Sequence, residues 1–189
     1  MWEALIEKDQ DWFLYLNQLG TPAWDSFWLF LSDKWGALPL YALLLFLVSR
    51  QLGWKRVLLF LVFIGLLITT TDQLSGFFKY GVQRLRPCYD PELEGLVRLV
   101  KSSCGGRFGY FSAHAANAFG LAAVFAVFWG KSRRLWGVLL IFWALLVGYS
   151  RIYLGVHYPL DVMTGFRAGG LLGWLFAQLY KKADQNIFK

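Results

Sequence analysis

The sequence predicts an all-α integral membrane protein, a bundle of about five to six transmembrane helices, on three observations. Of the 189 residues, 57% are apolar, and the mean hydropathy is +0.44. Ordinary soluble domains carry about 45–50% apolar residues even when glycine is counted among them. Several apolar runs approach the roughly 20 residues that cross a bilayer. Polar and charged residues gather between these runs, as in membrane spans joined by loops.

The N-terminal segment, residues 1–23, is predicted to be an interfacial helix followed by a turn. Residues 2–17 mix tryptophan, phenylalanine and leucine with charges, which is typical of an amphipathic helix at a membrane surface. Gly20 and Pro22 then break the helix. The segment is acidic where a secretory signal is basic, so we do not interpret it as a signal peptide.

Residues 24–180 are predicted to form the helical bundle of a single domain that covers residues 1–189. The stretch 24–49 contains two charged residues and a proline, so it forms either one bent span or a short helix followed by a span. Clearer spans lie at residues 55–79, 112–130, 134–151 and 159–180. A long loop, residues 87–111, is expected to lie over one end of the bundle.

The distribution of lysine and arginine predicts how the bundle is oriented. Three basic clusters fall on one side if the spans alternate, and the positive-inside rule assigns that side to the cytoplasm. They comprise Arg50, Lys55, Arg56, Lys131, Arg133, Arg134, Lys181, Lys182 and Lys189. Residues 80–111 and 151–158 then face the periplasm or the cell exterior. The net charge of +7 is scattered in short clusters and forms no stripe on a soluble helix, so nucleic acid is not an expected partner.

Cys88 and Cys104 are the two cysteines of the chain, and they bracket the long loop. In an oxidising compartment, a disulfide between them would hold this loop over the site. Closing a loop of this length stabilises a protein by roughly 3 kcal/mol in the chain-entropy model. Two unpaired thiols are the alternative, and the sequence leaves both possibilities open.

Polar segments at the ends of apolar runs carry candidate phosphate ligands. Lys79 and Arg86 are seven residues apart, so on a continuing helix they share one face, although Pro87 marks a helix boundary there. Ser112 is a good N-cap, and the free amides of the turn that holds His114 form an anion cradle. Each segment alone also fits a plainer interpretation, namely snorkelling cations or a simple helix cap.

A third segment contains Arg151, His157 and Asp161. His157 and Asp161 lie four residues apart across Pro159, which suits the first turn of a helix. The carboxylate can then hold one ring nitrogen and leave the other free to attack. A structural His–Asp pair explains this segment equally well by itself. The three segments end on the same predicted surface, and this convergence favours a phosphate-cleaving site.

Asp72 is a further ionisable residue near the outer end of a predicted span. Such residues are functional candidates by default, because charge is costly inside a membrane. Asp72 precedes Lys79 by seven residues, so it either orients that lysine or makes a hydrogen bond between helices.

In its polar segments the sequence resembles the type-2 phosphatidic acid phosphatase superfamily, which includes lipid phosphate phosphatases and vanadium haloperoxidases. The family signature has three parts, Lys-x6-Arg-Pro, Pro-Ser-Gly-His and Ser-Arg-x5-His-x3-Asp. The first and third parts are intact, and their residues are Lys79, Arg86, Pro87, Ser150, Arg151, His157 and Asp161. In the second part, Phe111 replaces proline and Ala113 replaces glycine, which affects loop geometry and rate more than reaction type. The resemblance extends over about residues 24–180.

The resemblance implies a role for each matching residue. His157 would be the nucleophile that forms a phosphohistidine, Asp161 would orient it, and His114 would protonate the leaving oxygen. The phosphoryl oxygens would be held by Lys79, Arg86, Ser112, Arg151 and the backbone amide of Ala113. No metal or other cofactor is implied, which agrees with a site where fixed cations already surround the phosphate.

The implied function is removal of the terminal phosphate from a lipid phosphate or diphosphate at the outer face of a bacterial cytoplasmic membrane. Undecaprenyl diphosphate is the first choice, because recycling that carrier is common among small bacterial members of this family. Phosphatidylglycerophosphate, phosphatidic acid and lipid A phosphates are the alternatives. A vanadate haloperoxidase and a non-catalytic lipid-phosphate binder or transporter are the rival classes. The expected partners are the bilayer and the lipid substrate, and the oligomeric state is not predicted.

Overall fold

The computed structural model describes residues 2–188. Met1 lies outside the described residues, and so does Lys189, which was predicted to belong to the basic cluster after the last span. Within this range the regular elements are helices, besides one isolated bridge between Leu85 and Phe108. The α-helices are α1 (Trp2–Gln18), α2 (Pro22–Ser32), α3 (Leu38–Ser49), α4 (Trp54–Val82), α5 (Ala113–Trp129), α6 (Arg134–Tyr153) and α7 (Pro159–Ile187). Short 3-10 helices cover Pro87–Tyr89, Pro91–Leu93 and Gly130–Arg133. The prediction of an all-helical protein is confirmed for the described residues.

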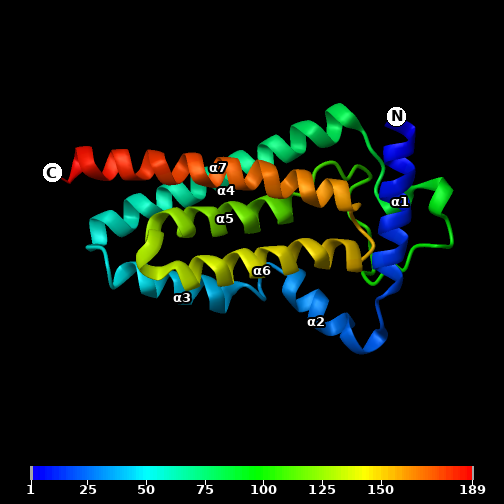
Figure 1. Cartoon of the computed structure of the whole chain (residues 1–189), viewed down its shortest axis with the longest axis horizontal. Coiled ribbons are helices and arrows are strands. Elements are labelled where there is room, and N and C mark those ends of the chain that lie inside the picture. The colour runs from blue at the N-terminus through cyan, green and yellow to red at the C-terminus, as the bar shows by residue number, and fades with distance from the viewer. Residues whose placement is uncertain (1, 189) are drawn as a thin grey trace.

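Helices α3 to α7 run along the long axis of the molecule, and α1 lies across one end of them (Figure 1). Helices α4 and α6 end at that end, and α5 and α7 begin there. The three polar segments therefore meet beside α1. The connections between α3 and α4 and between α5 and α6, together with the end of α7, lie at the opposite end and carry the basic clusters.

The stretch 24–49 forms two elements and not one bent span. Helix α2 ends at Ser32, and α3 begins at Leu38 with a proline at the second position, where its missing N–H is tolerated. Helix α3 has 12 residues, which is shorter than the roughly 20 that cross a bilayer. The outer boundaries also differ from the prediction, since α2 already begins at Pro22 and α7 continues to Ile187.

By length and hydropathy, two helical stretches of residues 2–188 are apolar enough to cross a membrane, Trp54–Val82 and Ala113–Tyr153. The second stretch contains both α5 and α6, which fold back beside each other (Figure 1). These criteria do not establish the predicted five to six spans. The bundle nevertheless exposes large apolar side chains on several helices, as expected of a surface that meets lipid. Examples are Phe46, Val62, Phe142, Leu171 and Trp174.

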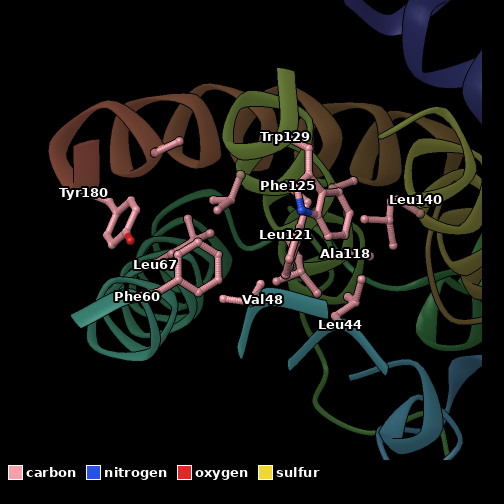
Figure 2. Packing of buried hydrophobic residues seen from close by; sticks show 14 of the residues in the cluster. Leu44, Val48, Phe60, Leu67, Ala118, Leu121, Phe125, Trp129, Leu140 and Tyr180 are labelled. Atoms are coloured by element: carbon pink, nitrogen blue, oxygen red, sulfur yellow. The ribbon is translucent and has the colours of Figure 1, made fainter. Parts of the chain in front are cut away.

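Helix α5 is the centre of the bundle. Beyond Asn117 it is apolar on all sides, as expected of a helix that is surrounded by others. Its residues Leu121, Phe125 and Trp129 belong to the main hydrophobic cluster, together with Phe60 of α4 and Tyr180 of α7 (Figure 2). Aromatic rings dominate this cluster at the end opposite to α1, where Phe60 and Tyr180 meet edge to face at 5.2 Å.

Small residues bring α5 and α7 into backbone contact. A Cβ atom added at Gly169 would lie 2.1 Å from the carbonyl oxygen of Ala116, and one at Gly173 would lie 2.3 Å from that of Gly120. Larger side chains cannot fit at either glycine. The repeat Gly165-x3-Gly169-x3-Gly173 is the sequence signal of such a contact between membrane helices, and the sequence analysis did not use it.

A substitution at Gly169 tests this packing. Alanine there must push α7 away from α5, so we expect Gly169→Ala to destabilise the protein by about 1–3 kcal/mol, the usual cost of overpacking. The measurement is the midpoint of thermal unfolding in detergent. Gly76→Ala in α4 is the matched control, because nothing lies within 4 Å of a Cβ atom added at Gly76. Equal midpoints for the two variants would contradict the proposed contact.

Candidate active site

The residues predicted to act on phosphate converge at the end of the bundle beside α1. They come from the last turns of α4 and α6, the first turns of α5 and α7, the loop between α4 and α5, and the connection between α6 and α7 that contains His157. They are Lys79, Arg86, Ser112, Ala113, His114, Arg151, His157 and Asp161. Four of them are almost fully buried in the protein: Ser112, Arg151, His157 and Asp161.

His157 and Asp161 form a buried pair at the start of α7. The Asp161 carboxylate oxygen Oδ2 lies 3.3 Å from Nδ1 of His157 and accepts a hydrogen bond of 3.1 Å from the backbone N–H of Tyr158. The pair forms because Pro159 opens α7, so the carboxylate turns back over the first helical turn toward the ring. With the Nδ1 proton directed at Asp161, Nε2 of His157 keeps the lone pair needed for nucleophilic attack.

The surroundings of His157 keep its ring neutral. Burial, and then the charges of Arg151, Arg86 and Lys79, hold the pKa of His157 well below its ordinary value. The side chain is 2% exposed. At neutral pH the imidazole therefore has an unprotonated nitrogen, and the same cations that lower its pKa are placed to attract a phosphate.

A polar cavity of about 580 Å³ opens at this end of the bundle. Arg86, Arg151 and His114 line it, so three of the predicted residues face one space. Lys101 of the long loop lines it as well and was not predicted. Two guanidinium groups and an ammonium group around one cavity suit the oxygens of a phosphate, which arginine binds with two parallel hydrogen bonds.

Lys79 and Arg86 do not share one helix face, contrary to the prediction for a continuing helix. Helix α4 ends at Val82, because Gln83 adopts a left-handed conformation with φ of 54°. The chain then leaves the helix axis before it reaches Arg86. Both side chains still act electrostatically on His157, so they reach the site from different directions.

Loop carbonyl groups hold Arg86 in place. Its guanidinium donates from Nε to the carbonyl oxygen of Phe108 at 3.2 Å and from Nη1 to that of Cys104 at 3.0 Å. In the structure Cys104 is joined to Cys88 by a disulfide, with the Cα atoms 6.3 Å apart. This bridge ties the loop to the residues that follow Arg86, so it also restrains the carbonyl that holds the guanidinium.

The altered second motif is held between α4 and α7. Phe111, which stands where the family has proline, accepts a hydrogen bond of 2.8 Å at its carbonyl oxygen from the Ser75 hydroxyl. The backbone N–H of Ser112 donates to the carbonyl oxygen of Asp161 at 3.1 Å. Ser112 is the N-cap of α5, and Ala113 is the first residue of the helix. The free amides of this first turn therefore lie beside the start of α7.

Arg84 and Asp9, two charged residues that were not predicted from the sequence, form a chain of ion pairs with Asp161. Arg84 lies with Nη1 3.1 Å from Oδ1 of Asp161 and with Nη2 2.6 Å from Oδ2 of Asp9 in α1. Asp9 is 5% exposed and also accepts a hydrogen bond of 2.9 Å from the backbone N–H of Leu160. Burial lowers the pKa of Arg84, but the Asp161 and Asp9 carboxylates outweigh it and raise that pKa above its ordinary value.

The sequence contains only weak signals for the ion pairs among Asp9, Arg84 and Asp161. Arg84 lies between the two cations of the first motif, and its position gave a weak signal. Asp9 resembled the other acids of an amphipathic helix, and only the packing of α1 against α7 buries it. The chain orients the Asp161 carboxylate and joins the interfacial helix to the site.

Helix α2 also contributes a contact to the site. The Arg151 guanidinium donates to the hydroxyl of Ser32, the last residue of α2, and Arg151 is 4% exposed. The end of α2 therefore supplies an oxygen atom that binds the buried Arg151 guanidinium.

A second cavity, apolar and of about 500 Å³, lies between α3, α4, α5 and α6. Aliphatic and aromatic side chains form most of its wall, among them Leu44, Phe60, Ile64, Leu121 and Val147. Asp72, His114 and Asn117 line it too, and His114 is common to both cavities. His114 therefore lies where the cationic cavity and the apolar cavity adjoin.

Comparisons with known proteins agree with this geometry. The chain is 39% identical to lipid A 4'-phosphatase of Bacteroides thetaiotaomicron, over 99% of this chain and 83% of the relative. It is 30% identical to lipid A 4'-phosphatase of Porphyromonas gingivalis, over 94% of this chain and 75% of the relative. Its fold matches the crystal structure of a transmembrane PAP2-type phosphatidylglycerolphosphate phosphatase from Bacillus subtilis. That match has a TM-score of 0.68 at 26% identity and covers 97% of this chain and 88% of the other.

A family model confirms the resemblance stated from the three motifs. The PAP2 superfamily model matches residues 57–185, a range that includes nearly all of α4, the long loop, α5, α6 and most of α7. All the predicted phosphate-site residues fall inside it. The chain belongs to the PAP2 superfamily.

Proposed function

We propose that this PAP2-superfamily phosphatase removes the phosphate monoester from the sugar headgroup of a lipid A-type glycolipid. The observation that carries the proposal is the junction of a cationic cavity and an apolar cavity at His114. A lipid phosphate has the same two parts in the same order. The names of the two relatives that align with most of this chain favour the 4'-phosphate of lipid A.

Undecaprenyl diphosphate, the substrate first expected from the sequence, is not supported as the specific substrate. Both relatives described above are named for lipid A 4'-phosphatase activity, which was among the alternatives. The shared motifs bind the phosphate and not the alcohol, so they did not separate these lipids. Contacts with the leaving alcohol must make that choice.

In the proposed mechanism, Nε2 of His157 attacks phosphorus and forms a phosphohistidine while the bond from phosphorus to the lipid oxygen breaks. His114 donates a proton to that oxygen, and the lipid leaves as an alcohol. His114, now neutral, takes a proton from a water molecule that attacks the phosphohistidine and releases inorganic phosphate. Arg86, Arg151 and Lys79 offset the charge that spreads over the phosphoryl oxygens.

The rival functions explain less of the site. A binder or transporter needs the cations, but it does not need a buried neutral histidine held by Asp161. A haloperoxidase that binds vanadate does not need the apolar cavity that reaches His114. The phosphatase uses the cationic pocket, the histidine pair and the apolar cavity together.

The proposal places the bundle in the bacterial cytoplasmic membrane with the site facing outward. Helix α1 then lies in the outer interface, and the basic end of the bundle meets the cytoplasm, as the positive-inside rule requires. Helices α2 and α3 together make one crossing, and α4 to α7 make four more. The substrate keeps its tails in the membrane while the phosphate reaches the cationic cavity.

Variants of the two histidines test the mechanism. We expect His157→Ala to abolish both turnover and the covalent phosphoenzyme, because it removes the attacking atom. His114→Ala keeps the nucleophile and is expected to slow turnover by about 10²–10⁴-fold, the usual contribution of a general acid. Rapid-quench labelling with lipid A that carries a radioactive phosphate measures the phosphoenzyme, and release of the labelled phosphate measures turnover. Wild-type phosphoenzyme levels in His157→Ala would overturn the assignment of the nucleophile.

A substrate panel tests the proposed function itself. Phosphate release by the purified protein is measured in EDTA with lipid A, phosphatidylglycerophosphate, phosphatidic acid and undecaprenyl diphosphate. We expect release in EDTA, since the residues around the cavity supply fixed positive charge, and the highest kcat/KM for lipid A. Vanadate, a mimic of the five-coordinate phosphoryl group, is expected to inhibit. Strict dependence on added Mg²⁺ or no release from lipid A would contradict the proposal.

The ion-pair chain of Asp9, Arg84 and Asp161 generates a prediction about stability. Asp9→Asn removes one of the two carboxylates that pair with Arg84 and leaves Asp161 as the other, so we expect the free energy of unfolding to fall by about 1–3 kcal/mol, the cost of an unsatisfied buried polar group. Asp11→Asn is the matched control, because Asp11 is exposed on the same helix and is expected to change stability by less than about 0.5 kcal/mol. Thermal unfolding in detergent checks both variants. Similar stability of the two would show that Asp9 does not hold the site.

A further inference from the structure

We propose that Asp72 and Asn117 form a subsite that recognises hydrogen-bond donors on the leaving alcohol of the lipid. The inference rests on the proposed function and deepens it, because it names the part of the protein that chooses between lipids. Asp72 lies on α4 and Asn117 on α5, and both line the apolar cavity that His114 also lines.

The pair lies on the leaving-group side of His114. Asn117 follows His114 by three residues on α5, so the two side chains share one helix face, about one turn apart. Asp72 precedes Lys79 by seven residues on α4, which places it roughly 10 Å deeper along the helix axis. Arg86 and Arg151 line the other cavity, so the phosphate is bound on the opposite side of His114. A group next to the scissile oxygen therefore points toward Asp72 and Asn117.

The hydrogen bonds made among residues 2–188 leave one carboxylate oxygen of Asp72 available as an acceptor. Asn117 donates from Nδ2 to Oδ1 of Asp72 at 2.9 Å, and its Oδ1 accepts from the Thr71 hydroxyl. The amide is thus held on both sides. Oδ2 of Asp72 has no hydrogen-bond partner among residues 2–188, and Asp72 is exposed to the cavity. An ionised carboxylate only accepts hydrogen bonds, so the complementary ligand group is a hydroxyl or an amide N–H.

Structural roles do not fully account for the charge of Asp72. The charge acts favourably on Lys79, but no ion pair joins the two side chains among residues 2–188, so this role leaves the second carboxylate oxygen available. The Thr71–Asn117 contact already joins α4 to α5 through neutral groups. Aliphatic and aromatic side chains such as Ile64, Ile68 and Leu121 surround Asp72 in the cavity wall. A carboxylate in such a span is costly and normally faces a ligand path or cavity. Both its cost and its orientation are explained if it meets a polar ligand group there.

The chemistry of the subsite separates a glycolipid phosphate from phosphatidic acid and undecaprenyl diphosphate, although phosphatidylglycerophosphate also carries a hydroxyl donor beside its terminal phosphate. An acylated amino sugar carries hydroxyl groups and an amide N–H close to the phosphate-bearing carbon, and these groups are donors. The diacylglycerol part of phosphatidic acid offers only ester oxygens, which are acceptors. In undecaprenyl diphosphate the group next to the scissile oxygen is a second phosphate, whose ionised oxygens are also acceptors. Asp72 therefore favours a glycolipid phosphate and leaves an unpaired charge beside the other two. A site that pairs with a substrate donor discriminates strongly against an analogue that lacks it.

The test measures a ratio of activities in Asp72 variants. The kcat/KM for lipid A and for phosphatidic acid is determined for the wild type, Asp72→Leu and Asp72→Asn. We expect the lipid A to phosphatidic acid ratio to fall at least tenfold in Asp72→Leu. It should recover in part in Asp72→Asn, which retains an acceptor oxygen. Gln73→Leu, an exposed neighbour on α4 outside the cavity wall, is the matched control and should keep the wild-type ratio.

Three outcomes separate the subsite from the proposed function. A ratio that stays at the wild-type value in Asp72→Leu, even if both activities fall together, means a structural role and overturns the subsite. A tenfold or larger loss that is specific to lipid A supports it. Failure of the wild-type protein to release phosphate from lipid A overturns the proposed function, whatever the variants do. Both activities are measured on the same preparation, so a misfolded fraction lowers both equally and leaves their ratio unchanged.

Discussion

The close contact between α5 and α7 is the constraint on which the site depends. Glycines on α7 let the backbone of the two helices meet, and the contact continues to the end of the bundle, where a Cβ atom at Gly165 would lie 2.6 Å from the carbonyl oxygen of Ser112. There the backbone N–H of Ser112 donates to the carbonyl oxygen of Asp161. The helix that carries His114 and the helix that follows His157 are therefore placed in fixed register.

Several cationic side chains gather around this contact, and they would repel one another if no oxygen atoms bound them. Each of the three arginines near the site is held by a different part of the chain. Loop carbonyls hold Arg86, the end of α2 holds Arg151, and two carboxylates hold Arg84. Backbone and side-chain oxygen atoms therefore fix the positions of the guanidinium groups before a phosphate binds, so little rearrangement is needed when charge develops on its oxygens.

The position of His114 at the junction of two cavities relates this electrostatic arrangement to a lipid substrate. The cationic cavity has the chemistry for a phosphate, and the apolar cavity has the chemistry for a hydrocarbon chain. Asp72 and Asn117 are polar residues in the wall of the apolar cavity, beside the place where the two parts of a lipid phosphate join. In the proposed function, reaction type and substrate choice depend on separate groups of side chains, which explains why the family motifs alone did not identify the lipid.

The sequence by itself determined the features that depend on short-range geometry. Apolar runs predicted the long helices, and the spacing of His157 and Asp161 across Pro159 predicted their pairing, because a helical turn brings residues four apart together. The tertiary structure alone decided the contacts between distant segments. Arg84 reaches an acid 75 residues earlier in the chain, and Asn117 reaches one 45 residues earlier. No local pattern encodes such pairs, since they exist only after glycine contacts and buried side chains have set how the helices pack.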